Sequence, residues 1–307
     1  METFLTYAII AVVIAIILAV IFKINHKNFN IEANREINIT RIVNQDRVLS
    51  FDINKIYLIN TGTSFDFNVY SDKVDEKLNP KNVIRECCNT DEHPNTIPVI
   101  LALDVTGSMG SACKETAEAL GKIMENLYTK YKDIQVMVMG IGDLAYDNGP
   151  IQISQFESDV RIAEWLDKIW IEGHGGGNSF ESYTAAWYMG LHHTKLDAFD
   201  KQGRKGIIIT MGDEPMNPYL PSYALASVTG DKLQGDVETK DLYEEASKKF
   251  DIFHIAVDDP DDSYRYYADR IKDSFGNLLG DRLMVSSINN LGKTICKCID
   301  QSSGSQT

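Results

Sequence analysis

Apolar positions follow two different spacings in the last two thirds of the chain. Runs of consecutive apolar residues predict buried strands, and apolar residues repeated every three or four positions predict helices with one buried face. We expect strands at residues 97–103, 134–141, 151–156, 206–211, 252–257 and 283–288. We expect helices at residues 116–131, 160–171, 183–196, 240–250, 266–279 and 291–299. This alternation predicts an α/β fold with a doubly wound, mainly parallel six-stranded sheet flanked by helices.

Residues 3–22 are predicted to form a single-pass transmembrane helix. They contain no charged residue, and residues 8–22 are wholly apolar. Roughly twenty such residues in a helix cross the bilayer hydrocarbon core. The alternative is a cleaved signal peptide, which needs a basic N-terminal region and a small-residue cleavage site that this segment lacks. Four basic residues follow the span and none precedes it, which predicts that the C-terminal part is cytoplasmic. The four are Lys23, Lys27, Arg35 and Arg41.

Residues 23–92 are polar and contain short stretches of alternating apolar and polar residues. This alternation predicts a small, half-buried β-element. The segment carries no group of side chains that we can assign to chemistry, so we interpret it as a β-rich stalk or packing extension. The α/β domain is then predicted to occupy residues 93–302, and residues 303–307 to form a disordered tail.

Acidic residues outnumber basic ones, with 44 Asp and Glu against 30 Lys and Arg, and the formal net charge is −14. This balance argues against nucleic acid as a partner, because phosphate backbones are bound by surfaces rich in Lys and Arg. The five cysteines include one adjacent pair and one C-x-C, which is a poor disulfide framework and lacks the paired knuckles of a zinc site. We expect reduced thiols at Cys87, Cys88, Cys113, Cys296 and Cys298.

Three loops that follow predicted strands carry oxygen ligands for a metal ion. The first spells D-x-T-x-S at residues 104–108, the second spells H-G-G-G-N-S-F-E-S at residues 174–182, and the third spells T-M-G-D-E-P at residues 210–215. In a parallel sheet, ligands bind beyond the carboxyl ends of the strands. Neutral hydroxyls mixed with few carboxylates suit Mg²⁺, which keeps several waters and prefers oxygen ligands. The candidate ligands are Asp104, Thr106, Ser108, Ser179, Glu181 and Asp213.

These residues resemble the metal-ion-dependent adhesion site (MIDAS) of the von Willebrand factor A (vWA) family. Its signature is D-x-S-x-S, then a Thr on a second loop and an Asp on a third. Asp104, Thr106 and Ser108 match the first element, with Thr in place of the middle Ser. Asp213 matches the third element, whereas the second loop departs from the pattern. The position of the Thr is taken by Glu181, with Ser179 as the rival.

The resemblance implies a Rossmann-like vWA fold and a bound Mg²⁺, with Mn²⁺ or Ca²⁺ as alternatives. It also implies that the metal accepts an acidic side chain of a partner protein. The alternative without a metal is that Asp104 and Ser108 cap the helix that follows them.

Two other classes of function are alternatives to the binding module. Aspartate-nucleophile phosphotransferases carry D-x-D-x-T, whose second Asp is the general acid, and this chain has Thr106 there. We therefore do not expect an enzyme. The other class is an assembly subunit that works with an AAA+ ATPase, as in some relatives of the vWA family. Residues 140–145 spell the dinucleotide fingerprint G-x-G-x-x-A, but a turn into another strand is expected after them instead of a helix.

Overall fold

The computed structural model describes residues 73–304, with gaps at 108, 160, 173–177 and 259–262. The predicted transmembrane helix at residues 3–22 lies outside the described residues, as do residues 23–72 of the predicted extension. Among the described helices, none is both long enough and apolar enough to cross a membrane.

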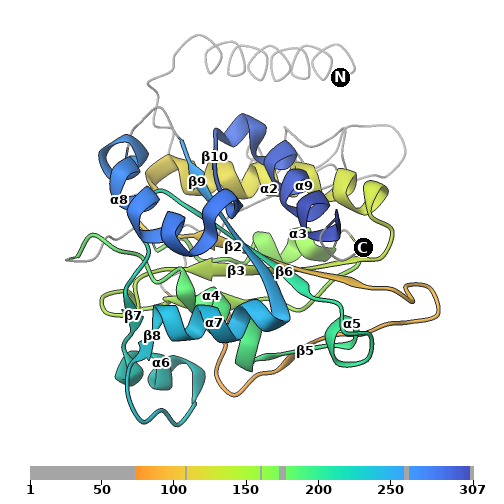
Figure 1. Ribbon diagram of the computed structural model, residues 1–307, viewed down its shortest axis with the longest axis horizontal. Helices are drawn as coiled ribbons and strands as arrows, with labels where there is room; N and C mark the ends of the chain where they lie inside the picture. The colour runs from red at the N-terminus through yellow and green to blue at the C-terminus, as the bar shows by residue number, and fades with distance from the viewer. Residues whose placement is uncertain (1–72, 108, 160, 173–177, 259–262, 305–307) are drawn as a thin grey trace, which may run out of the picture. The chain divides into compact units, whose positions relative to one another are not determined.

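A six-stranded sheet forms the centre of the described domain (Figure 1). Its strand order is β10-β9-β6-β2-β3-β4, and only the pairing of β4 with β3 is antiparallel. The strands are β2 (Ile97–Asp104), β3 (Ile134–Ile141), β4 (Ile151–Ile153), β6 (Gly206–Gly212), β9 (Phe250–Val257) and β10 (Leu283–Ser286). The central strands are buried along nearly their whole length, which their continuous apolar runs predicted. The predicted mainly parallel six-stranded sheet is confirmed.

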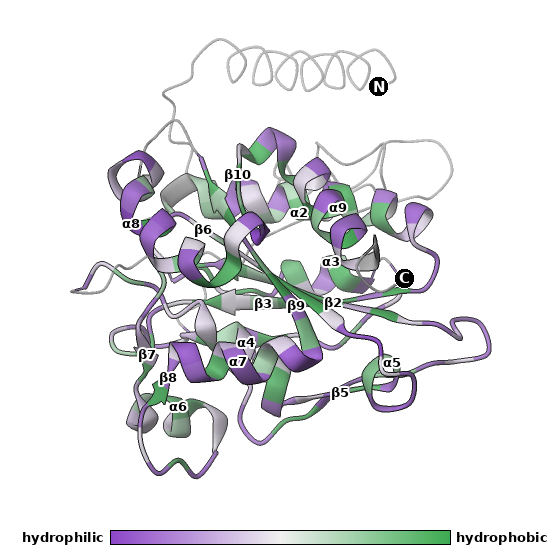
Figure 2. Cartoon of the chain, in the orientation of Figure 1, coloured by the Kyte–Doolittle hydropathy of each residue, from purple (hydrophilic) through white to green (hydrophobic). Residues whose placement is uncertain are grey.

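Helices cover both faces of the sheet. One face packs against α2 (Gly110–Lys130), α3 (Arg161–Leu166) and α9 (Leu291–Gly304). The other packs against α4 (Thr184–His192), α7 (Thr239–Lys249) and α8 (Ser263–Leu279). Residues of β2 alternate between the two cores: Val99 and Leu101 lie in the first, and Ile100 and Ala102 lie in the second. Figure 2 shows hydrophobic residues along the central strands and a mixture of hydrophobic and hydrophilic residues along the helices.

Smaller elements surround this sheet. A two-stranded parallel pair joins β1 (Arg85–Cys87) to β5 (Thr194–Leu196), and an antiparallel pair joins β7 (Tyr219–Leu220) to β8 (Val237–Glu238). The remaining helices are η2 (Glu76–Leu78), α5 (Asp197–Asp200), α6 (Ser222–Thr229), η3 (Gly280–Arg282) and η4 (Ile288–Asn290).

Two predicted helices end early, each for a non-local reason. The helix predicted to reach residue 196 ends at His192, because Thr194–Leu196 pairs with β1 instead. The helix predicted to reach residue 171 ends at Leu166. A turn and an irregular segment follow, and the main chain of Trp170 exchanges two hydrogen bonds of 2.8 Å with the side chain of Gln152.

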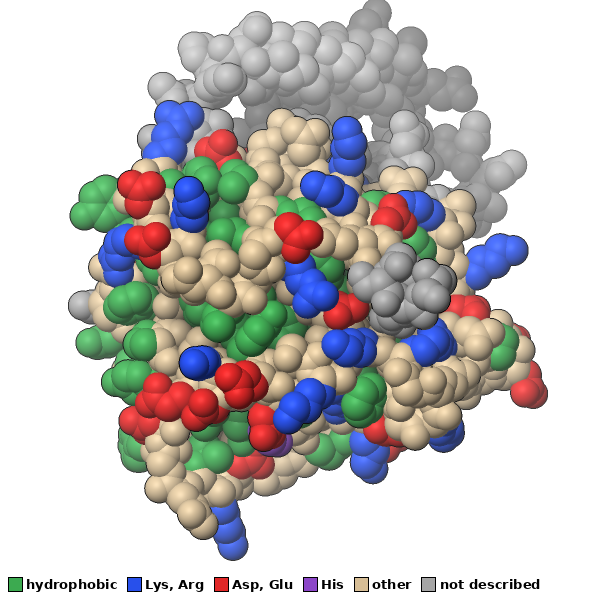
Figure 3. All heavy atoms as spheres, viewed as in Figure 1, with side chains coloured by type: hydrophobic (Ala, Val, Ile, Leu, Met, Phe, Trp, Pro, Cys, Tyr) green, Lys and Arg blue, Asp and Glu red, His purple; other side chains and the backbone are tan. Residues whose placement is uncertain are grey.

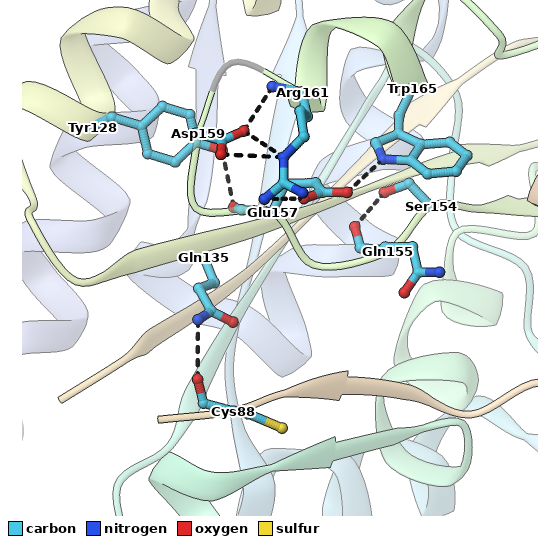
Figure 4. Close-up of polar contacts among 9 residues, drawn as sticks. All are labelled: Cys88, Tyr128, Gln135, Ser154, Gln155, Glu157, Asp159, Arg161 and Trp165. Atoms are coloured by element: carbon cyan, nitrogen blue, oxygen red, sulfur yellow. Dashed lines mark hydrogen bonds and ion pairs between the residues drawn. The ribbon is translucent and has the colours of Figure 1, made fainter. Parts of the chain in front are cut away.

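A polar cluster closes the sheet beside β4 (Figure 4). Glu157 continues the antiparallel pairing with β3 as an isolated bridge. Its carboxylate accepts a hydrogen bond of 2.9 Å from Trp165 and forms an ion pair of 3.2 Å with Arg161. Tyr128 of α2 donates its hydroxyl to the carbonyl of Glu157 at 3.0 Å. These contacts fix α3 and α2 against the sheet edge.

Candidate metal centre

Acidic residues gather where β2, β3 and β6 reach their carboxyl ends. Asp104 is the last residue of β2, and Asp213 directly follows β6. Asp143 lies two residues beyond the end of β3. These three strands are neighbours in the sheet, so their ends share one edge. Asp104, Asp143 and Asp213 are at most 4% exposed.

Asp104 is held by hydroxyl and amide donors. Its Oδ1 accepts hydrogen bonds from the main-chain N–H and the hydroxyl of Thr106, at 2.9 and 2.6 Å. Its Oδ2 accepts a hydrogen bond of 2.5 Å from the hydroxyl of Tyr183. The same Tyr183 oxygen accepts a hydrogen bond of 3.3 Å from the main-chain N–H of Glu214. Tyr183 therefore links the first loop to the third.

These contacts exclude the capping alternative for Asp104. Among the described residues, Asp104 forms no hydrogen bond with an N–H of α2, which begins six residues later, at Gly110. Asp104 therefore does not cap the helix, and that alternative is wrong for this residue. The second proposed cap, Ser108, lies outside the described residues.

The second loop is fixed between the other loops of this edge. Glu181 pairs with the third loop through two main-chain hydrogen bonds of 3.2 Å, to the carbonyl of Pro215 and from the N–H of Asn217. The neighbouring Ser182 accepts a hydrogen bond of 3.0 Å from the N–H of Leu144, in the loop after β3. The Glu181 side chain is 3% exposed, and its Oε2 has no hydrogen-bond partner among the described residues.

The electrostatics of this edge disfavour ionised carboxyls. Burial, then the negative charge of Asp213, raises the pKa of Asp104 to about 8. Burial, then the charges of Asp104, Glu214 and other carboxylates, raises the pKa of Glu181 to about 11. Within the described residues, no Lys, Arg or His forms an ion pair with Asp104 or Glu181. A bound cation would supply the missing positive charge, so the residues present fit a metal by charge and by ligand type.

The predicted ligands divide into three groups. Asp104, Thr106, Glu181 and Asp213 are all buried at this edge, and the first three carry contacts given above. Ser179 is half-buried, and its main-chain carbonyl accepts a hydrogen bond of 3.1 Å from Arg270. Ser108 lies outside the described residues. That these residues ligate a metal stays a prediction.

In the described part of the chain, three or more His, Cys, Asp or Glu side chains nowhere form an arrangement that could hold a metal ion. The three predicted carboxylates, Asp104, Glu181 and Asp213, therefore do not form such an arrangement by themselves, and the predicted site also needs the hydroxyls of Thr106 and Ser108.

Three residues of this edge were missed at the level of sequence. Tyr183 gave no signal, because the direction of a tyrosine hydroxyl depends on tertiary packing. Glu214 directly follows Asp213, and Asp143 follows a predicted strand, so the sequence positions of both residues could have predicted that they lie at this edge. The G-x-G-x-x-A motif drew attention to the Asp143 loop only as a nucleotide site. A strand follows that loop, as predicted.

No protein-family model and no curated protein sequence matches the chain. Among solved structures it is similar to the open conformation of the pilus adhesin SpaC from Lactobacillus rhamnosus GG, at 10% identity and a TM-score of 0.48. That match covers 72% of this chain and 31% of SpaC.

Two further structures are similar. The vWF domain of the type V pili tip protein Mfa5 from Porphyromonas gingivalis matches at 10% identity and a TM-score of 0.44, over 67% of this chain and 94% of that domain. Proximal thread matrix protein 1 from the mussel byssus, with a zinc-occupied MIDAS motif, matches at 12% identity and a TM-score of 0.42. That match covers 67% of this chain and 47% of the mussel protein.

Proposed function

We propose that the described domain is a vWA-type binding module with a divalent cation, Mg²⁺ by ligand type, at Asp104, Thr106 and Asp213. In this proposal Ser108 adds a hydroxyl ligand, and an acidic side chain of a partner protein completes the metal shell. The observation that carries the proposal is the buried carboxyl of Asp104 at the end of β2, whose hydrogen bonds come from two hydroxyls and one main-chain N–H, with the buried Asp213 after the neighbouring strand β6.

Each residue has a separate role in this proposal. The hydroxyl of Thr106 donates a hydrogen bond to Asp104, and in this proposal its oxygen is also a ligand of the cation. Tyr183 holds the second oxygen of Asp104 and so fixes the carboxylate plane. When bound, the cation supplies an electrophilic centre that attracts a carboxylate. Of the two rivals on the second loop, we favour Glu181, because it is buried beside Asp104 whereas Ser179 is half-buried.

A Mg²⁺-dependent phosphotransferase is less well supported. Such an enzyme requires a general acid two residues after the nucleophilic Asp. Here that residue is Thr106, and its hydroxyl is bonded to Asp104. We therefore propose binding without turnover.

We also propose that residues 3–22 anchor the protein in a membrane, with the domain on the cytoplasmic side. The support is the uncharged apolar segment and the basic residues that follow it. A topology reporter fused after Thr307 is expected to read as cytoplasmic, and a reading from the opposite side would overturn the orientation.

The metal proposal is tested by melting the full chain with millimolar Mg²⁺ and with EDTA. A ligand at one hundred times its Kd stabilises the native state by about 2.7 kcal/mol, so Mg²⁺ is expected to raise the Tm. Asp104→Ala is expected to abolish this response. Asp241→Ala, an exposed aspartate of α7, serves as the control and keeps it. Identical melting of the wild type in Mg²⁺ and EDTA would overturn the proposal.

A further inference from the structure

The Asp104 carboxylate is held at both of its oxygens, and by different parts of the chain. Its Oδ1 accepts hydrogen bonds from the main-chain N–H and the hydroxyl of Thr106, within the first loop. Its Oδ2 accepts a hydrogen bond of 2.5 Å from the hydroxyl of Tyr183, which lies outside the D-x-T-x-S motif. The carboxylate therefore cannot turn about its Cβ–Cγ bond without losing the contact with Tyr183.

These hydrogen bonds leave little of Asp104 for a metal ion. An ionised carboxylate can accept at about four lone-pair positions, two on each oxygen. Among the described residues, Thr106 occupies both positions on Oδ1, and Tyr183 occupies one of the two on Oδ2. A cation that keeps these hydrogen bonds can bind only through Oδ2. Binding through both oxygens requires the carboxylate to turn.

Tyr183 is itself fixed in the core. Its side chain is fully buried, and its ring centre lies 5.0 Å from that of His254 and 5.8 Å from that of Phe275. A Cβ at Gly212, the last residue of β6, would overlap the Tyr183 hydroxyl, so glycine allows this close approach. The hydroxyl also accepts a hydrogen bond of 3.3 Å from the N–H of Glu214. It therefore cannot move away from Asp104 unless the core around β6 and β9 repacks.

We infer that Tyr183 is a specificity-determining residue of the metal site, because it limits Asp104 to one fixed oxygen and so favours Mg²⁺ over Ca²⁺. The inference rests on the proposed function of this site. Mg²⁺ demands near-octahedral geometry with short bonds, whereas Ca²⁺ takes about six to eight oxygens in a flexible shell and often both oxygens of a carboxylate. A carboxylate that cannot turn suits Mg²⁺. Without the Tyr183 hydroxyl, Oδ2 is free and the carboxylate can turn to suit Ca²⁺.

The test is calorimetric titration of the full chain with Mg²⁺ and, separately, with Ca²⁺. In Tyr183→Phe we expect the Kd for Mg²⁺ to rise about tenfold, as the loss of a group behind a metal ligand does. We expect the Kd for Ca²⁺ to stay the same, because the freed oxygen compensates for the lost support. Tyr188→Phe is the matched control. Tyr188 is buried, and its hydroxyl donates to another carboxylate, that of Asp231, at 2.6 Å, so this variant should keep both Kd values.

The outcomes separate this inference from the proposed function. If the wild type binds neither Mg²⁺ nor Ca²⁺, both are overturned. If both Kd values rise by the same factor in Tyr183→Phe, Tyr183 only supports the fold around the site, and the inference is wrong while the metal site stands.

Gly212→Ala decides if Tyr183→Phe does not fold. The added Cβ displaces the Tyr183 hydroxyl from Asp104 and leaves the tyrosine in the chain. We expect the same tenfold loss of preference for Mg²⁺ over Ca²⁺ as in Tyr183→Phe, on the order set by a group behind a metal ligand. An unchanged ratio of the two Kd values overturns the inference.

Discussion

Two aspartates lie buried at opposite ends of the same parallel sheet, and their surroundings differ. Asp251, near the start of β9, is 3% exposed and lies beside two basic side chains and a hydroxyl. Its carboxylate contacts Arg282 at 3.4 Å, Lys205 at 3.8 Å and the hydroxyl of Ser302 at 2.8 Å. Asp104, at the end of β2, is fully buried, and its contacts are hydroxyls and one main-chain N–H.

The difference separates a buried carboxylate that basic side chains of the protein neutralise from one that they do not neutralise. A buried carboxylate with Lys or Arg beside it is neutralised by the protein itself and needs no bound cation. A buried carboxylate that contacts only neutral donors keeps an uncompensated negative charge when it is ionised, and a bound cation would neutralise that charge. The charges of exposed acids are compensated by water and by basic neighbours. Figure 3 shows Asp and Glu mixed with Lys and Arg on the viewed face of the domain.

The largest expected effect is on stability at the Asp251 end. Asp251→Ala removes the buried acceptor that Arg282, Lys205 and Ser302 share, and losing hydrogen bonds to a charged group of this kind costs about 2 kcal/mol. We expect the free energy of unfolding to fall by this amount equally in EDTA and in Mg²⁺. Denaturant titration of the full chain measures both values.

Asp281→Ala is the matched control for that experiment. Asp281 is exposed and accepts one hydrogen bond of 3.0 Å, from Gln301. An exposed contact of this kind contributes less than about 1 kcal/mol. If Asp251→Ala costs no more than Asp281→Ala, or if Mg²⁺ restores the loss, the two ends of the sheet do not differ as we describe.

A smaller effect is expected from pH at the Asp104 end. Folding raises the pKa of Asp104 from 3.8 to about 8, chiefly by burial. The native state therefore holds this proton more tightly than the unfolded state. The contribution is fully present below the unfolded pKa and is lost as pH rises through about 8. In EDTA, we expect the Tm of the wild type to fall between pH 5 and pH 8.

Asp104→Asn sharpens this comparison. The amide has no proton to lose, so we expect the fall in Tm to be smaller and the metal-free variant to be more stable than the wild type at pH 8, by on the order of 1 kcal/mol. Calorimetry at four pH values in EDTA measures the slopes. Equal slopes for the two proteins would show that Asp104 is not destabilised by its surroundings.

The sheet was predictable from sequence to a greater extent than the site. Residues 134–141 form a strand with the predicted bounds, because a run of apolar residues buried on both faces has few other solutions. The end of α4 at His192 was not predictable, since it depends on pairing with a strand a hundred residues earlier in the chain. The roles of Tyr183 and Asp143 depend likewise on which loops meet, which no local pattern encodes.

The smallest expected effect concerns Arg270 of α8, which contacts the second loop from outside the site. Its guanidinium lies 5.0 Å from the ring centre of Phe180 and 5.3 Å from that of Tyr267, and it donates to the carbonyl of Ser179 at 3.1 Å. These contacts hold the two residues that precede Glu181. Exposed cation–π contacts contribute about 0.5–1 kcal/mol each, and part of that energy positions Glu181.

We therefore expect Arg270→Gln to raise the Kd for Mn²⁺ about threefold to fivefold, which corresponds to less than about 1 kcal/mol. The Kd of Arg270→Lys is expected to lie between those of the wild type and Arg270→Gln, because lysine keeps the charge but lacks the planar group that stacks on the rings. Lys272→Gln, on the exposed side of the same helix, should leave the Kd unchanged. Titration with Mn²⁺ and melting in EDTA are measured together. If Arg270→Gln lowers the metal-free Tm and leaves the Kd unchanged, Arg270 stabilises the fold without positioning Glu181. In that case Arg270 does not contribute to metal binding.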